Sequence, residues 1–141
     1  MLRFQYMVWN DIFSHLADML IAYLLALPIA WDREAATKGG AGLRTFPIVA
    51  MASCGFVLVG IGVFGEKSAA MASVLYGLIV GIGFIGSGTI IKSSSEMRGN
   101  TTAASIWVTG AIGAATGFAL YDIAFVLSFV TFVTLRMKFR Q

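Results

Sequence analysis

Few residues of this chain could carry out chemistry. The sequence has one histidine, His15, and one cysteine, Cys54, and its carboxylates do not cluster in any expected pocket. Catalytic sites need several reactive groups to converge, and protein zinc sites normally need three or four ligands. We therefore expect no catalytic residue, no metal site and no cofactor, and a protein that is not an enzyme.

The richest polar residues lie in short segments between long apolar runs. These residues are Asp32, Arg33, Glu34, Lys38, Arg44, Thr45, Arg98, Asn100, Thr101 and Thr102. Thr45, and either Asn100 or Thr101, are candidate helix N-caps, because their side-chain oxygens can accept backbone N–H groups. Two helix N-termini beside arginines would favour an anion, such as a lipid phosphate or a soluble phosphate.

The acids in the same segments offer these arginines a second partner. We predict that Asp32 or Glu34 pairs with Arg44 or Arg98 and so ties the loops together. The simpler alternative is that the arginines set the topology and touch lipid headgroups.

Asp18 is the one acid placed inside an apolar run. Ionisable residues at membrane depth are costly, which makes Asp18 a candidate functional residue, although a shallow position reached by water is the alternative. His15 lies three residues earlier and is a candidate partner, although one Asp-His pair is too little for a proton relay or a metal site. Asp122, at the start of the last run, is expected to be an N-cap.

The composition places these residues in a membrane protein. The chain is 58% apolar and only 12% charged, whereas soluble domains carry about 25% charged residues. About 20 helical residues cross a bilayer, which predicts an all-α bundle of about five transmembrane helices in one domain, 1–141. The expected spans are 13–31, 45–64, 69–91, 101–120 and 122–136.

The basic residues predict how these spans are oriented. With the N-terminus outside and the C-terminus in the cytoplasm, eight basic residues lie inside and only Arg3 and Lys67 lie outside. That bias is the one expected from the positive-inside rule. Because the basic residues occupy the gaps between runs and not one helix face, nucleic acid is not an expected partner.

Two of the expected spans are rich in glycine. The third contains Gly77, Gly81, Gly83, Gly86 and Gly88, and the fourth contains Gly110, Gly113 and Gly117. A GxGxxG pattern at Gly81 lies inside an apolar run, so a nucleotide site is excluded. Close helix packing is favoured, with a GxxxG pair at Gly77 and Gly81. A broken helix that lines a polar cavity is the alternative.

Four hydroxyls follow one stripe of the fourth span, at Thr102, Ser105, Thr109 and Thr116. Such hydroxyls usually bond back to their own helix or across to a neighbour. A water-lined path along the stripe is the less favoured alternative.

The polar segments resemble the MgtC/SapB family of bacterial inner-membrane proteins. The matching motifs are Asp32-Arg33-Glu34, Ala41-Gly42-Leu43-Arg44-Thr45, Gly81 to Gly88, and Arg98-Gly99 followed by Thr102-Ala103-Ala104 and Trp107. Departures are Asp32, where the family usually has Glu, and Ala30-Trp31 in place of Gly-Leu. The resemblance implies a small multi-pass protein that modulates other membrane proteins, with links to low magnesium and to restraint of the ATP synthase.

Three functions are therefore open. The leading hypothesis is a non-enzymatic modulator that acts through lateral helix contacts and its charged inner face, and that can form a homo-oligomer. The rival is a channel or carrier for Mg²⁺ or another cation that uses Asp18 and the hydroxyl stripe. The third is a lipid or anion sensor at the inner arginines.

Overall fold

The computed structural model describes residues 9–37, 40–92 and 97–137, which form five helices and one short hairpin. The elements are α1 (Trp9–Ala36), α2 (Thr45–Phe64), α3 (Ala70–Ser87), β1 (Ile91–Lys92), β2 (Met97–Arg98), α4 (Asn100–Gly117) and α5 (Tyr121–Arg136). The strands are antiparallel, with Ile91 opposite Arg98 and Lys92 opposite Met97. The predicted bundle of five helices is confirmed for the described residues.

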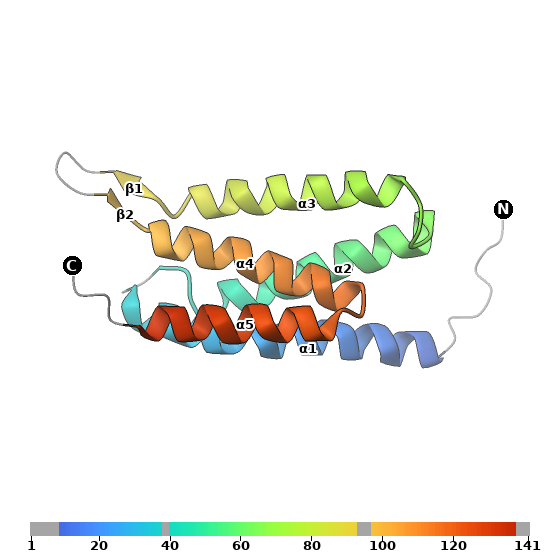
Figure 1. Ribbon diagram of the computed structural model, residues 1–141, viewed down its shortest axis with the longest axis horizontal. Coiled ribbons are helices and arrows are strands. Elements are labelled where there is room, and N and C mark those ends of the chain that lie inside the picture. The colour runs from blue at the N-terminus through green and yellow to red at the C-terminus, as the bar shows by residue number, and fades with distance from the viewer. Residues whose placement is uncertain (1–8, 38–39, 93–96, 138–141) are drawn as a thin grey trace.

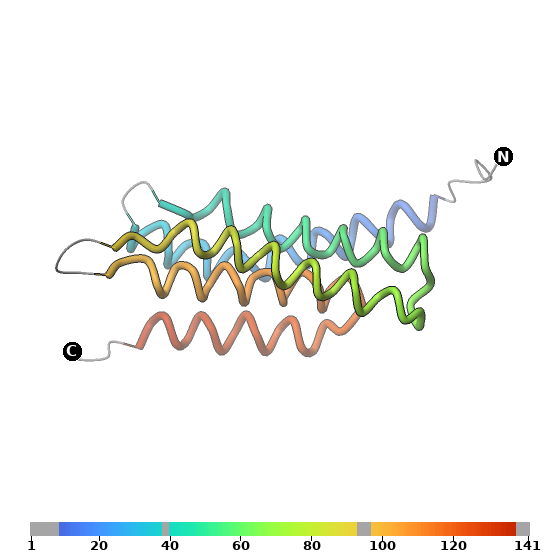
Figure 2. The backbone as a smooth tube through the Cα atoms, turned by 90° about the horizontal axis from the view of Figure 1, so that it is seen from above, coloured from blue at the N-terminus to red at the C-terminus, as the bar shows by residue number. Residues whose placement is uncertain are grey.

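The five helices lie side by side along one long axis, and α4 lies at the centre of the bundle (Figures 1 and 2). Helix α4 packs against each of the other four helices. Its sequence explains this position, because most of its residues are glycine, alanine, serine or threonine, which let neighbouring helices approach closely. Ten of its residues are buried, against three in α3, which has the same length.

The two ends of the bundle differ in charge. One end, called here the basic end, holds the α1–α2 link, the β1–β2 hairpin and the last turn of α5 (Figure 1). The described cations at that end are Arg33, Arg44, Lys92, Arg98 and Arg136. The other end, the turn end, holds the start of α1 and the α2–α3 and α4–α5 turns, and its described cation is Lys67.

The outer surface of the bundle is apolar. Large hydrophobic side chains such as Phe56, Phe84 and Phe125 are 60–79% exposed, a surface that suits lipid and not water. By length and composition, three of the described helices could cross a membrane, namely α1, α2 and α3. Helices α4 and α5 run beside them. The bundle therefore has the fold of a membrane protein.

The helices other than α2 begin or end at positions that differ from the limits of the expected spans. Helix α1 continues past position 31 to Ala36, and α3 ends at Ser87, before the hairpin, where a span to position 91 was expected. The predicted caps at Thr45, Asn100, Thr101 and Asp122 are wrong, since the cap positions are Arg44, Gly99 and Leu120, without side-chain cap bonds.

Local backbone geometry explains two of these errors. Arg44 is already helical, and the N–H of Phe46 donates to the Gly42 carbonyl, so Thr45 lies inside the helix. Gly99 has a φ of 95°, a left-handed conformation that favours glycine, and a Cβ there would clash with the Thr89 carbonyl oxygen. The chain therefore turns into α4 at Gly99, one residue before Asn100.

Candidate functional site

Three polar contacts join α1 to α5 at nearly constant intervals. The Tyr121 hydroxyl donates to Asp18 Oδ1 at 2.5 Å, and the Ser128 hydroxyl donates to the Leu25 carbonyl at 2.6 Å. Arg136 Nε lies 3.4 Å from Asp32 Oδ1. Positions seven residues apart lie on one face of a helix, so two parallel helices keep these contacts in register. We call this set the α1–α5 ladder.

At the basic end of the ladder, Asp32 bridges two arginines. Arg33 donates to Asp32 Oδ2 from Nη2 at 2.5 Å and from Nε at 3.1 Å. The side chains of Asp32 and Arg33 are each only 12% exposed, whereas that of Arg136 is 59% exposed and lies over the Phe132 ring. Asp32 thus connects the end of α1 with the end of α5.

Glu34 makes a separate contact with the link that leads into α2. Its carboxylate accepts the Leu43 N–H at 3.0 Å. A Cβ at position 42 would clash with Glu34 Oε2, so Gly42 leaves the space that this carboxylate occupies. Gly42 and Leu43 of the loop motif therefore form the contact surface for the Glu34 carboxylate.

These contacts differ from the predicted pairs. Asp32 pairs with Arg33 and Arg136, and Glu34 bonds to a backbone N–H, where Arg44 or Arg98 was expected. The reason is that α5 runs parallel to α1 and brings Arg136 beside Asp32, an arrangement that the order of loops along the sequence does not reveal.

The remaining members of the predicted inner-face cluster share the basic end. Arg44 is exposed, Arg98 is in β2, and Asn100, Thr101 and Thr102 form the first turn of α4. Lys38 lies outside the described residues. Asp32, Arg33 and Glu34 make the contacts given above, and the other described members lie at the same end of the bundle on separate elements.

Asp18 also has a partner that the sequence reasoning missed. We expected His15, but the bonded group is Tyr121 of α5. Ser128 and Arg136 were likewise not predicted as partners. The signal was present in the sequence, because Asp18, Leu25 and Asp32 recur every seven residues and so do Tyr121 and Ser128.

The glycines of α4 are packed as predicted. A Cβ at Gly110 would clash with Ile82 of α3, and one at Gly113 would clash with the Ala50 carbonyl oxygen of α2. A Cβ at Gly117 would lie 2.7 Å from Val57 Cβ and 3.0 Å from the Cys54 carbonyl oxygen. Contacts under 3.0 Å force a shift of the neighbour, so these three glycines allow α2 and α3 to approach α4 closely.

The glycines of α3, and Gly88 directly after it, behave differently. A Cβ at Gly86 would lie 3.2 Å from the Ala103 carbonyl oxygen of α4, and one at Gly88 would approach only the carbonyls of Ile85 and Phe84. At Gly77, Gly81 and Gly83 no such atom lies within 4 Å. Close packing at the Gly77–Gly81 pair is therefore not found between the described residues of this chain.

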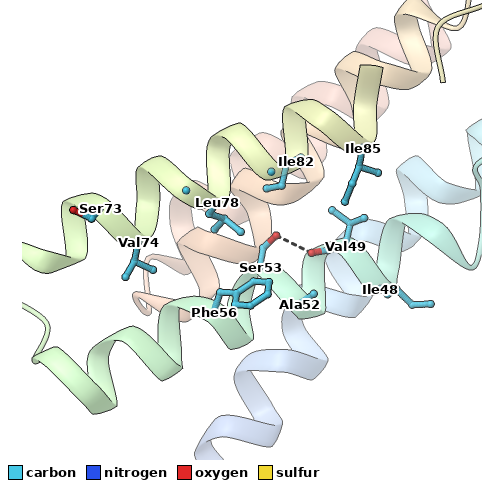
Figure 3. A pocket seen from close by; sticks show the side chains of 12 residues that line it. Ile48, Val49, Ala52, Ser53, Phe56, Ser73, Val74, Leu78, Ile82 and Ile85 are labelled. Carbon is cyan, nitrogen blue, oxygen red and sulfur yellow. Dashed lines mark hydrogen bonds between the residues drawn. The ribbon is translucent and has the colours of Figure 1, made fainter. Parts of the chain in front are cut away.

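Gly77 and Gly81 instead line an apolar groove of about 500 Å³ between α2 and α3, called here the α2–α3 groove (Figure 3). Its other walls include Val49, Phe56 and Ile85. Further lining residues are Ile48, Ala52, Ser53, Ser73, Val74, Leu78 and Ile82. The Ser53 hydroxyl donates to its own helix at the Val49 carbonyl, 2.8 Å away, so it presents no unbonded donor to the groove.

The hydroxyl stripe of α4 bonds back to its own helix. Ser105 donates to the Thr101 carbonyl at 2.7 Å, Thr109 to the Ser105 carbonyl at 2.8 Å, and Thr116 to the Gly113 carbonyl at 2.7 Å. These three side chains are buried in the bundle. The favoured prediction for the stripe, that its hydroxyls donate to carbonyls of their own helix, is confirmed for these three residues.

Fold and site together define a helical membrane protein whose central helix is rich in small residues. The sequence profile of the MgtC family matches residues 19–140. The chain therefore belongs to the MgtC family, as its motifs indicate.

Relatives with this similarity come from several bacteria. Protein SrpB of Synechococcus elongatus is 37% identical, covering 83% of this chain and 70% of SrpB. The putative magnesium transporter YhiD of Escherichia coli is 32% identical, covering 86% of this chain and 60% of YhiD. Protein MgtC of Brucella abortus is 34% identical, covering 81% of this chain but only 47% of that protein. The chain thus spans about half to two thirds of their length, and no solved structure matches it.

Proposed function

We propose that this protein is a non-enzymatic modulator of other membrane proteins, which it binds through the α2–α3 groove. The observation that carries the proposal is the open glycine face of α3, where Gly77 and Gly81 have no close neighbour and line an apolar groove. The proposed occupant is a transmembrane helix of a partner protein.

The physics of helix association in lipid supports this choice. Lipid tails are as apolar as leucine, so helices associate in membranes through close packing, and small residues four apart permit it. Glycine also weakens a helix by roughly 0.5–1 kcal/mol relative to alanine. At Gly110, Gly113 and Gly117 close packing within the chain offsets that cost, whereas the described chain supplies no such packing at Gly77 and Gly81. A helix from another protein would supply it.

We further propose that all five helices cross the bacterial inner membrane, with the basic end in the cytoplasm and the N-terminus outside. The gathering of Arg33, Arg44, Lys92, Arg98 and Arg136 at one end supports this orientation. Labelling of single cysteines at Arg44 and Lys67 with an impermeant reagent on intact cells tests it. Labelling of position 44 and not 67 from outside the cell contradicts it.

The proposed role is adaptation to low magnesium or control of membrane energetics, including the ATP synthase. The magnesium-related name of YhiD supports the first of these settings. For the rival function of a cation carrier, Asp18 and the α4 hydroxyls are the expected path, yet Asp18 bonds to Tyr121 and the hydroxyls bond to their own helix. Cation flux in proteoliposomes that is lost on Asp18→Asn would favour the carrier.

Photocrosslinking across the groove tests the modulator. A photoreactive residue at Ile85, which lines the groove and is 48% exposed, should form one discrete adduct with a partner in native membranes. Gly81→Leu should abolish that adduct because its side chain fills the groove. Gly83→Leu is the matched control, since position 83 is equally open but does not line the groove.

Three results would contradict the proposal. The first is an adduct that survives Gly81→Leu, and the second is an equal loss with Gly83→Leu. The third is an adduct formed only with a second copy of this chain, which would make the groove a homo-oligomer contact. Size-exclusion profiles of each variant in mild detergent show that the folded bundle is retained.

A further inference from the structure

The α4–α5 turn lies deeper in the bundle than the other structures at the turn end. Gly117, the last residue of α4, packs against Val57, and α2 then continues for seven more residues to Phe64. Tyr121, the first residue of α5, bonds to Asp18, and α1 starts nine residues earlier at Trp9. At 1.5 Å per residue, α2 and α1 extend about 10 Å and 14 Å beyond the turn. Figure 1 shows the same difference in level.

The charged residues fix where this level lies in a membrane. Glu66 and Lys67 follow the end of α2, and Asp11 lies in the first turn of α1. In the arrangement proposed above, with all five helices across the membrane, these positions mark its surface at the turn end. Helix α5, with 16 residues, is about 24 Å long against a hydrocarbon core of about 30 Å. With Arg136 at the opposite surface, Tyr121 and Asp18 remain inside the thickness of the core.

The groups at this level are unsuited to hydrocarbon. Within the described residues, the N–H groups of Tyr121, Asp122 and Ile123 have no hydrogen-bond acceptor, and α5 has no side-chain cap. Asp122 is exposed beside them, and Ala119 and Leu120 leave irregular backbone exposed. Irregular backbone is tolerated at membrane depth only where protein buries it or water reaches it, and described protein does not bury it here.

We propose that water fills the step between the α4–α5 turn and the ends of α1 and α2, and so reaches Asp18, Tyr121 and Asp122 within the membrane. The ligands of this site are water molecules that accept from the first N–H groups of α5 and donate to the two carboxyl groups. This explains how two acids lie at that depth without a basic partner among the described residues. The step is thus a hydrated depression at the turn end of the bundle.

The first test measures thiol reactivity in lipid nanodiscs, where both faces are open to reagent. In a Cys54→Ala background, Leu120→Cys places a thiol at the turn, where the native side chain is 45% exposed. Val59→Cys is the control, because Val59 is 64% exposed and therefore accessible from outside the bundle. It lies two residues beyond Val57, which packs against Gly117, and so is near the level of the α4–α5 turn. A water-soluble charged thiol reagent should label position 120 at least roughly tenfold faster than position 59, since the thiolate forms only in a water-like medium.

Two outcomes overturn the proposal. Equally slow labelling of both positions would place the turn in hydrocarbon, and equally fast labelling would show that the whole leaflet is thinned around the protein. If Leu120→Cys does not fold, Asp122→Cys, at the second residue of α5, repeats the measurement. A nitroxide spin label at the same two positions gives a second measure, because a nickel chelate relaxes labels in water and oxygen relaxes labels in hydrocarbon. At position 120 the relaxation by the nickel chelate should exceed that by oxygen. At position 59 the relaxation by oxygen should be the larger.

Discussion

Helices α3 and α4 have the same length and are both rich in glycine, yet they use glycine in opposite ways. The three glycines of α4 each allow a neighbouring helix to approach, whereas Gly77, Gly81 and Gly83 of α3 have no close neighbour. The difference lies in the residues beside the glycines. In α4 these include the buried Thr109 and Ile112, while α3 carries the exposed Tyr76 and Phe84. Glycine spacing shows that a helix can be approached closely, and the surrounding residues show from which side.

The largest effect should come from filling the most tightly packed glycine of α4. In Gly113→Leu the new side chain would meet the Ala50 carbonyl and Ser53, and backbone atoms cannot rotate away. We expect destabilisation of roughly 3 kcal/mol or more and loss of folded protein. The measurement is the yield of monodisperse protein by size exclusion in mild detergent. A normal yield would show that α2 and α4 can separate, and would break the comparison.

A smaller effect is expected at Gly110, because its neighbour is a flexible side chain. A Cβ at that position would meet the end of Ile82, which can change rotamer. Gly110→Ala should cost about 1–2 kcal/mol. Shortening the neighbour in the double variant Gly110→Ala with Ile82→Val should recover part of the loss in thermal stability. If the double variant is no more stable than Gly110→Ala, the clash with Ile82 is not the cause.

Gly86 sharpens the comparison, because it is the α3 glycine that approaches α4. A Cβ there would lie 3.2 Å from the Ala103 carbonyl oxygen. This contact is tight, and Ala103 would have to move by a few tenths of an ångström to relieve it. We expect Gly86→Ala to cost up to about 1 kcal/mol, partly offset by the better helix propensity of alanine. The midpoint of thermal unfolding should fall slightly below that of the native protein. An increase would place Gly86 with the open glycines.

The sequence was sufficient to predict most of the fold. Low charge and long apolar runs indicate helices in lipid, and the range predicted for 45–64 coincides with α2. The gathering of basic residues at one end also follows from the alternation of runs and gaps. These features depend on composition and local order along the chain, which the sequence contains directly.

The partners of individual residues were harder to predict. Asp32 pairs with Arg136 and Asp18 with Tyr121 because α5 lies parallel to α1, more than 100 positions away in the sequence. The caps failed for a local reason, since the left-handed turn at Gly99 starts α4 one residue early. Partners across the bundle depend on which helices are neighbours, and apolar runs do not specify neighbours.

The smallest effect on stability is expected at Gly81, and it is the sharpest test of the open face. In Gly81→Ala the added methyl group has no atom of the described chain within 4 Å, so no packing is lost. The bundle should unfold within about 0.5 kcal/mol of the native protein, or be stabilised by up to about 1 kcal/mol through helix propensity. The measurement is thermal unfolding of the purified protein beside Gly86→Ala on the same helix. Destabilisation equal to that of Gly86→Ala would mean that another chain, most simply a second copy, already packs on this face in the purified protein.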